Sequence, residues 1–84
     1  MKLFVLVFDF ATGYDPKDYG NLKLRLQVAR ARCLFGEVYA IRSDQTATEI
    51  KDYYRLALRP YDRLFVALVT EWASRRASFD LGKF

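Results

Sequence analysis

The side-chain types in this sequence limit the chemistry it can support. The 84 residues include no histidine, and Cys33 is the only cysteine. Imidazole general-base catalysis, a Ser-His-Asp triad and histidine metal ligation are therefore excluded. A single thiol cannot form an intramolecular disulfide or a multi-cysteine zinc site, and we expect Cys33 to be a small buried residue. Neither Gly13 nor Gly20 has the glycine spacing or the lysine of a phosphate-binding loop.

Basic side chains are the most numerous reactive groups. Lysine and arginine total 14 against 10 aspartate and glutamate residues, giving a formal charge of +4. This excess favours anionic partners, with nucleic acid first among them. Four of the cations lie in a stretch without acids between Asp18 and Glu37, namely Lys23, Arg25, Arg30 and Arg32. They are either phosphate contacts or the solvated face of a helix.

A second basic group lies near the C-terminus, where Trp72 precedes Arg75 and Arg76. Base faces stack on indole and guanidinium groups, so these three residues are candidates for a nucleic-acid contact. The alternative is that Trp72 packs against the edge of a sheet. The sequence leaves both interpretations open.

Asp9 is the acid with the most distinctive position, because it ends an apolar run that starts at the N-terminus. It has no carboxylate companion in its own segment, and Asp15 and Asp18 are explained as helix-start residues. One acid is not a metal site. From the residues alone, Asp9 is a turn residue that accepts hydrogen bonds from the backbone of residues 11–13.

Four segments have the composition of strands. Residues 2–8 and 63–70 are continuous apolar runs rich in valine and phenylalanine, which is typical of buried strands. Residues 32–35 and 37–42 flank Gly36, and the alternation in the second segment predicts a hairpin with unequal arms.

Two helices are predicted between these strands. Asp15 and Pro16 form a helix start, although residues 22–28 alternate with the period of a strand. Strong helix formers favour a helix there, with one face made of Tyr19, Leu22, Leu26, Ala29 and Cys33. Thr46 and Glu49 form a capping box, and Pro60 ends the second helix. Its buried stripe comprises Ala47, Ile50, Tyr54, Ala57 and Leu58.

The order βαββαβ predicts an α+β fold of the ferredoxin-like kind, in which residues 1–84 form one domain. Right-handed crossovers place both helices on one face of a four-stranded antiparallel sheet. The first strand is apolar in both registers, so the open face needs a cover. We expect a homodimer whose interface contains Phe4, Leu6 and Phe8, the alternatives being another protein or the chain's own tail. Residues 71–84 form either a short edge strand or a mobile tail.

Two protein families resemble parts of this pattern. Residues 4–10 (FVLVFDF) resemble the start of the CRISPR-associated Cas-two family and its VapD-type ribonuclease relatives. The remaining similarity is to SinR-like proteins, a group of small bacterial and phage proteins, in residues 37–42 (EVYAIR), 46–52 (TATEIKD), 61–66 (YDRLFV) and 70–72 (TEW). Together these segments span most of the chain up to Trp72.

The resemblance implies a ferredoxin-like homodimer in which Asp9 corresponds to the strand-end aspartate of the Cas-two family. In the nuclease members, one such aspartate from each subunit is proposed to hold a divalent metal. Carboxylates suit Mg²⁺, and the metal polarises phosphate and lowers the pKa of bound water. Mg²⁺ and a catalytic, metal-binding Asp9 are thus expectations from the resemblance alone.

Three functions follow from this pattern as hypotheses. The first is a dimer bound to DNA or RNA, with or without weak Mg²⁺-dependent endonuclease activity, using Lys23, Arg25, Arg30, Arg32, Arg75 and Arg76 on the phosphates. The second is a non-catalytic interaction module, such as a phage or mobile-element protein that binds a host protein. The third is a small ligand-binding regulatory domain. We expect a cytoplasmic location without a membrane partner, because the first apolar run is too short for a signal peptide or a membrane span.

Overall fold

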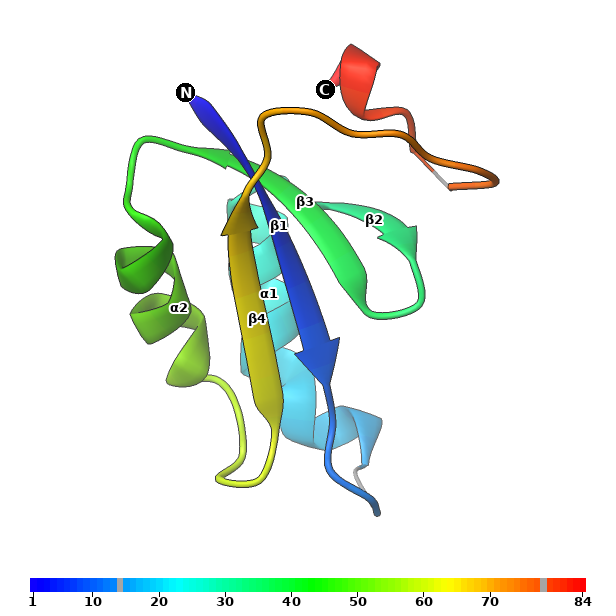
Figure 1. Cartoon of the computed structure of the whole chain (residues 1–84). Coiled ribbons are helices and arrows are strands. Elements are labelled where there is room, and N and C mark those ends of the chain that lie inside the picture. Colours follow the sequence, from blue (N-terminus) through cyan, green and yellow to red (C-terminus); the bar gives the residue numbers. More distant parts are fainter. Residues whose placement is uncertain (14, 78) are drawn as a thin grey trace.

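A four-stranded antiparallel sheet forms the centre of the computed structural model, which describes residues 1–13, 15–77 and 79–84. The strand order is β2-β3-β1-β4, so β1 lies inside the sheet and β2 and β4 form its edges (Figure 1). The strands are β1 (Lys2–Asp9), β2 (Arg32–Phe35), β3 (Val38–Ser43) and β4 (Arg63–Leu68). The strand positions agree with the sequence-based expectation.

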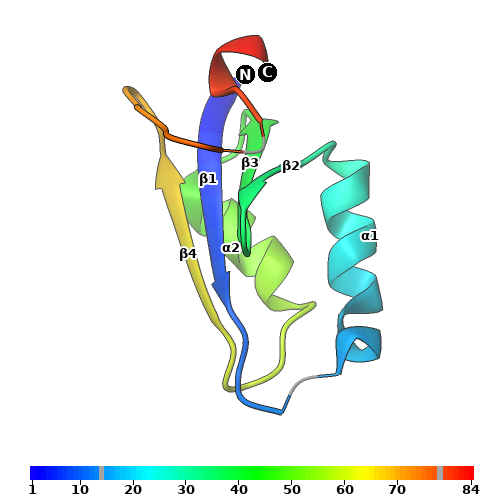
Figure 2. The ribbon, with the colours of Figure 1, turned by 90° about the vertical axis from the view of Figure 1, so that its right-hand side faces the viewer.

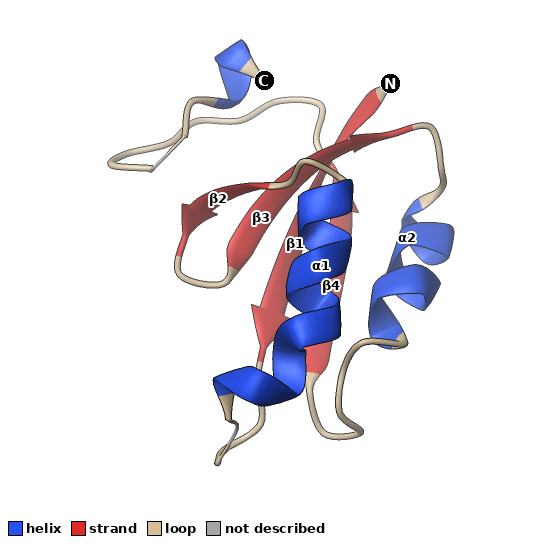
Figure 3. Cartoon of the chain, turned by 180° about the vertical axis from the view of Figure 1, so that it is seen from behind, coloured by secondary structure: helices blue, strands red, loops and turns tan. Residues whose placement is uncertain are grey.

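Two helices cover one face of this sheet (Figure 3), namely α1 (Gly20–Val28) and α2 (Ala47–Arg55). A short 3₁₀ turn, η1 (Pro16–Tyr19), precedes α1, and the Asp15 side chain caps it by accepting a hydrogen bond from the Lys17 amide. Thr46 caps α2 in the expected capping box with Glu49. The α+β architecture with two helices and an antiparallel sheet is therefore confirmed, and it is consistent with a ferredoxin-like fold.

The main core lies between the helices and the sheet. Phe4, Leu6 and Phe8 of β1 are almost fully buried there against Ile50 and Tyr54 of α2. Burial, followed by the nearby Tyr53, raises the pKa of Tyr54 to about 12. The expected dimer contacts Phe4, Leu6 and Phe8 are thus corrected: they face the helices and are unavailable to a second copy. Because β1 is apolar on both faces, its alternation alone could not indicate which set faces the helices.

The opposite face of the sheet has a smaller core of its own. Leu3 and Ala40 are buried there together with Leu34 and with Leu81 of the C-terminal turn η2 (Leu81–Lys83). Figure 2 shows the tail on the side of the sheet away from the helices, near the end where both termini lie. The sequence allows the tail, folded across this open face of the sheet, as one of its possible covers. No part of it that the structure describes is a strand.

Arg42 of β3 holds the two ends of the chain together. Its Nε donates to the Phe84 carbonyl at 3.2 Å and its Nη1 donates to the Met1 carbonyl at 3.4 Å. The guanidinium also lies 5.6 Å from the centre of the Phe84 ring, a cation–π distance. These contacts fix the last residues of the tail against the sheet.

Two further expectations concern single features. Cys33, expected in the core, is exposed on the edge strand β2, where its thiol lies 3.5 Å from the Gly36 carbonyl. This is because α1 ends at Val28 and the chain becomes extended before residue 33. No helix in the described residues is both long and apolar enough to cross a membrane.

Candidate functional site

The tail leaves the two ends of one row of the open sheet face exposed. Strand pairing aligns Phe65 of β4 with Val7, Val7 with Val38, and Val38 with Phe35 of β2, so the row crosses all four strands. Its two outer side chains are 64% and 58% exposed, for Phe65 and Phe35 respectively. We call these four residues the apolar row. Exposed aromatic side chains on one sheet face form a flat hydrophobic surface.

A cavity adjoins the apolar row where the tail crosses the sheet. Its volume is about 510 Å³, and Val5, Leu34, Phe35 and Val38 of the sheet contribute to its lining. The tail contributes Trp72, Phe79 and Leu81 and also the charged residues Glu71 and Arg75. Trp72 is 45% exposed. Phe35 and Trp72 therefore belong both to the cavity wall and to the solvent-facing surface.

Arginine side chains border this surface. The Arg32 guanidinium lies 5.0 Å from the ring centre of Phe79, which lines the cavity. Arg75 lines the cavity itself. Arg63 lies two residues before Phe65 on β4 and is exposed. The open face thus combines exposed aromatic rings with cations on the same side of the sheet.

Asp9 lies at the end of β1 and pairs with Arg63. The Asp9 Oδ2 atom accepts hydrogen bonds from Arg63 Nε at 2.9 Å and from Arg63 Nη2 at 2.7 Å. Within the described residues no three acids, cysteines or histidines are grouped as metal ligands. The Asp9 carboxylate is thus paired with a cation on the neighbouring strand.

The predicted phosphate-binding cations do not form one group. Lys23 lies on α1, on the helix side of the sheet, beside a separate hollow lined by Phe10 and Tyr39. Arg25 Nη1 donates to the Tyr53 carbonyl at 2.6 Å and so joins α1 to α2. Arg30 lies in the turn after α1, with a φ of 55°. Arg32 and Arg75 are the two that contact or line the cavity.

Arg76 completes the predicted set. It is exposed in the tail next to Arg75, and its φ is 58°. A positive φ is uncommon for a side chain larger than glycine. It marks a change of direction in the tail between two groups of cavity-lining residues, Trp72 and Arg75 before it and Ala77 and Leu81 after it.

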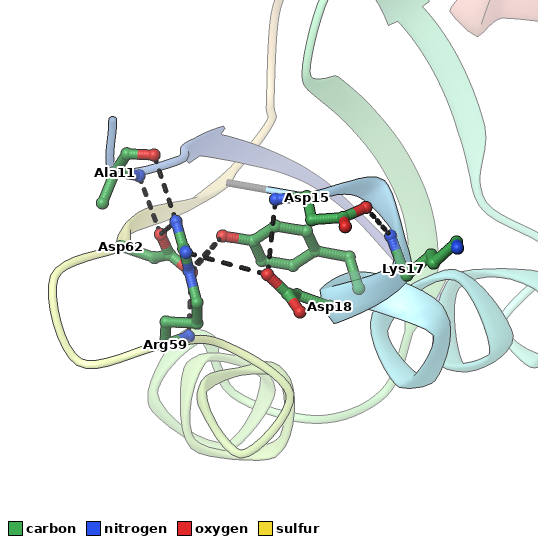
Figure 4. A network of polar contacts seen from close by, with 7 residues as sticks. Ala11, Asp15, Lys17, Asp18, Arg59 and Asp62 are labelled. Carbon is green, nitrogen blue, oxygen red and sulfur yellow. Dashed lines mark hydrogen bonds and ion pairs between the residues drawn. The ribbon is translucent and has the colours of Figure 1, made fainter. Parts of the chain in front are cut away.

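A buried polar network joins three loops at the other end of the sheet (Figure 4). The Asp62 carboxylate accepts bonds from the Ala11 amide at 2.8 Å, the Tyr19 hydroxyl at 2.7 Å and the Arg59 amide at 2.8 Å. Arg59 also donates from Nε to the Tyr19 hydroxyl at 2.9 Å and from Nη2 to the Ala11 carbonyl at 3.1 Å. Because the carboxylate accepts donors from three separate segments, this network joins the loops at this end of the fold.

The network also alters the pKa of two of its members. Burial of the Asp62 carboxylate alone would raise its pKa, but the bonds from Ala11, Tyr19 and Arg59 outweigh burial and lower that pKa. Burial raises the pKa of the Tyr19 hydroxyl, and its bond to Asp62 adds to this effect. A charged Asp62 facing a neutral Tyr19 is therefore the stable pairing near neutral pH.

The sequence did not single out Phe35 and Phe65. Both lie in segments that were correctly predicted as strands, but their faces depend on the register of pairing. One signal was present: Arg63, Phe65 and Ala67 share a strand face that begins with a charged residue, which is typical of a face that meets solvent. The bulge at Leu34 in β2 had no comparable signal.

Comparisons with known proteins give no family for this chain. The sequence matches no protein-family model, and no curated protein matches it.

Proposed function

We propose that this protein binds single-stranded nucleic acid on the open face of its sheet. The observation that carries the proposal is the apolar row, whose exposed ends Phe65 and Phe35 lie on the same face as Trp72 and several arginines. Unstacked bases gain binding free energy when they stack on aromatic side chains, and this holds for every base.

The charges around the row support the same partner. Arg32 lies over the Phe79 ring and Arg75 lines the cavity beside Trp72, and guanidinium groups bind phosphate through paired N–H donors. The formal charge of +4 adds a general attraction for a polyanion. An apolar protein partner would not call for cations beside the aromatic rings of this face.

We propose binding without cleavage. Asp9 is the only candidate catalytic residue that the resemblance supplied, and its Oδ2 atom is held by Arg63. Asp9 and Arg63 together fix the end of β1 to β4. Their role in this proposal is to hold β4, which carries Phe65, against β1.

The binding test uses a fluorescent homopolymeric strand of about 12 nucleotides, within the range of single-strand sites on small domains. Fluorescence anisotropy at low and moderate salt gives the dissociation constant. Phe65→Ala and Phe35→Ala are each expected to weaken binding about tenfold, because one stacking contact is lost. Affinity of the unaltered protein should fall steeply with salt as counterions are released.

Tyr61→Ala is the matched control. Tyr61 is 86% exposed in the turn between α2 and β4, away from the row, so its removal should change affinity less than about twofold. The proposal is wrong if the unaltered protein does not bind at low salt. It is also wrong if all three aromatic variants behave alike.

A further inference from the structure

We propose that the cavity beneath the tail receives one base of the bound strand and selects bases that carry an exocyclic amino group. This inference rests on the proposed function and names the chemical feature that the same site recognises. The apolar row and the cavity share Phe35 and Val38. A nucleic-acid strand stacked along the apolar row therefore reaches the cavity without crossing another element.

The size and lining of the cavity fit a planar base. A volume of about 510 Å³ lies within the range of about 300 to 1,000 Å³ that small-molecule sites occupy. The walls from the sheet are aliphatic at Val5, Leu34 and Val38, whereas Phe35 and Trp72 contribute aromatic rings. A base that enters the cavity loses its stacking contacts with neighbouring bases. Contacts with the aliphatic and aromatic walls replace them.

Charges of both signs at the cavity have separate roles. Arg75 lines the cavity and Arg32 lies against Phe79 in its wall, so both can contact the phosphates on either side of an inserted base. Glu71 is an acid among the lining residues. A carboxylate would repel phosphate, but it accepts a hydrogen bond from an amino group such as N4 of cytosine.

Glu71 therefore predicts the base preference. Cytosine presents its N4 amino donor at the position where thymine presents its O4 carbonyl acceptor, and a carboxylate placed at this position accepts from the amino group only. Thymine held in the same orientation would put O4 against the carboxylate, and it must shift for its N3–H to donate instead. We expect oligo(dC) to bind about fivefold tighter than oligo(dT) of the same length, a modest ratio because a single contact provides it.

The experiment uses Trp72 as its own reporter, because it is the only tryptophan in the chain. Oligo(dC) and oligo(dT) of about 12 nucleotides are titrated while anisotropy and tryptophan emission are both recorded. A base that stacks in the cavity should quench Trp72 emission, and oligo(dC) should do so at lower concentration.

Two variants test the cavity itself. Glu71→Gln replaces the carboxylate by an amide that pairs with either base, so the ratio between the two strands should fall to about one. Ala77→Phe fills space at a residue that lines the cavity, and it should abolish the quenching. Glu37→Gln, an exposed acid outside the cavity lining, is the matched control and should keep both the ratio and the quenching.

The outcomes separate this inference from the proposed function. Phe65→Ala could weaken binding of both oligonucleotides while Glu71→Gln and Ala77→Phe leave the affinity ratio and the Trp72 quenching unchanged. In that case base selection in the cavity is wrong, and binding of single-stranded nucleic acid stands. If the unaltered protein binds neither strand, both proposals fail. If Glu71→Gln removes the preference for oligo(dC) and Glu37→Gln keeps it, base selection in the cavity is supported. This holds even if Ala77→Phe does not fold.

Discussion

At the scale of single residues, the most constrained side chain is Asp62. Its side chain is inaccessible to solvent, and its carboxylate joins the segment after β1, the end of η1 and the turn that follows α2. A buried charge is stable only when donors replace its lost hydration, and here two amides and a hydroxyl do so. The same loops hold both helices against the sheet, so Asp62 supports the open face from a distance.

The lowered pKa of Asp62 predicts a specific loss of stability in acid. The folded state holds this carboxylate charged below its ordinary pKa of 3.8, so the unfolded chain binds the proton first as the pH falls. The stabilising contribution is therefore complete well above that value and is lost as the pH falls through the folded pKa. Asp62→Asn should lower the free energy of unfolding at pH 7 by about 3 kcal/mol, because the amide faces groups that donate.

Urea unfolding at pH 7 and pH 3 measures both effects. The unaltered protein should lose more stability between these pH values than Asp62→Asn does. Asp44→Asn is the control, because the Asp44 side chain is mostly exposed and lies 3.8 Å from the N-terminal amine, the distance of a weak surface ion pair. An equal acid loss in Asp62→Asn and the unaltered protein would assign the pH dependence to other carboxylates.

At the scale of elements, the sequence predicts helix starts better than strand faces. Asp15 and Thr46 act through local contacts within three residues, so their capping roles were predictable. The orientation of β1 was not, because both of its faces are apolar and burial is decided by partners distant in sequence. Phe4, Leu6 and Phe8 were assigned to the wrong face for this reason, and the exposed row was missed with them.

Arg25 shows that contacts between residues distant in sequence also decide which predicted cations belong to the candidate site. It was predicted to contact phosphate, but it bonds the Tyr53 carbonyl and lies 4.3 Å from the Tyr53 ring centre. Arg25→Gln should lower the free energy of unfolding by about 1 kcal/mol through loss of this link between helices. The substitution should change the affinity for single-stranded nucleic acid by less than about twofold.

Arg75→Gln is the matched comparison for Arg25→Gln. Arg75 lines the cavity in the tail, so its removal should weaken strand binding and reduce the salt dependence by about one phosphate contact. Thermal unfolding and anisotropy measured on both variants separate the two roles. Equal losses of affinity would mean that the cations act only through net charge.

At the scale of the whole molecule, the cover of the open face was the least predictable feature. Residues 71–84 show no hydrophobic period, so nothing local indicated that Leu81 would be buried against Leu3, Leu34 and Ala40. The apolar β1 correctly required a cover. The tail supplies it only in part, and the remaining surface is the apolar row.

The tail leaves a homodimer open through a different surface, the edge of β4. This strand pairs only with β1, and after Arg63 it contains no charge, proline or glycine, whereas the other edge, β2, is short and bulged. The Val69 amide donates to the Leu3 carbonyl, so by alternation Leu64, Val66 and Leu68 direct their amides away from β1. An unprotected edge of this kind presents unpaired backbone groups to which another strand can pair.

We therefore expect two copies to pair through β4 in antiparallel fashion and form one continuous sheet at high protein concentration. Leu68→Lys places a charge on the exposed edge and should shift the protein to a single copy in light scattering after gel filtration. Val28→Lys makes the same change on the exposed surface of α1 and should keep the dimer. Pairing at β4 leaves the open faces of both copies uncovered. Leu68→Lys should therefore still bind single-stranded nucleic acid. A single-copy mass for the unaltered protein at every concentration would rule out the dimer and leave the open face as the only binding surface proposed.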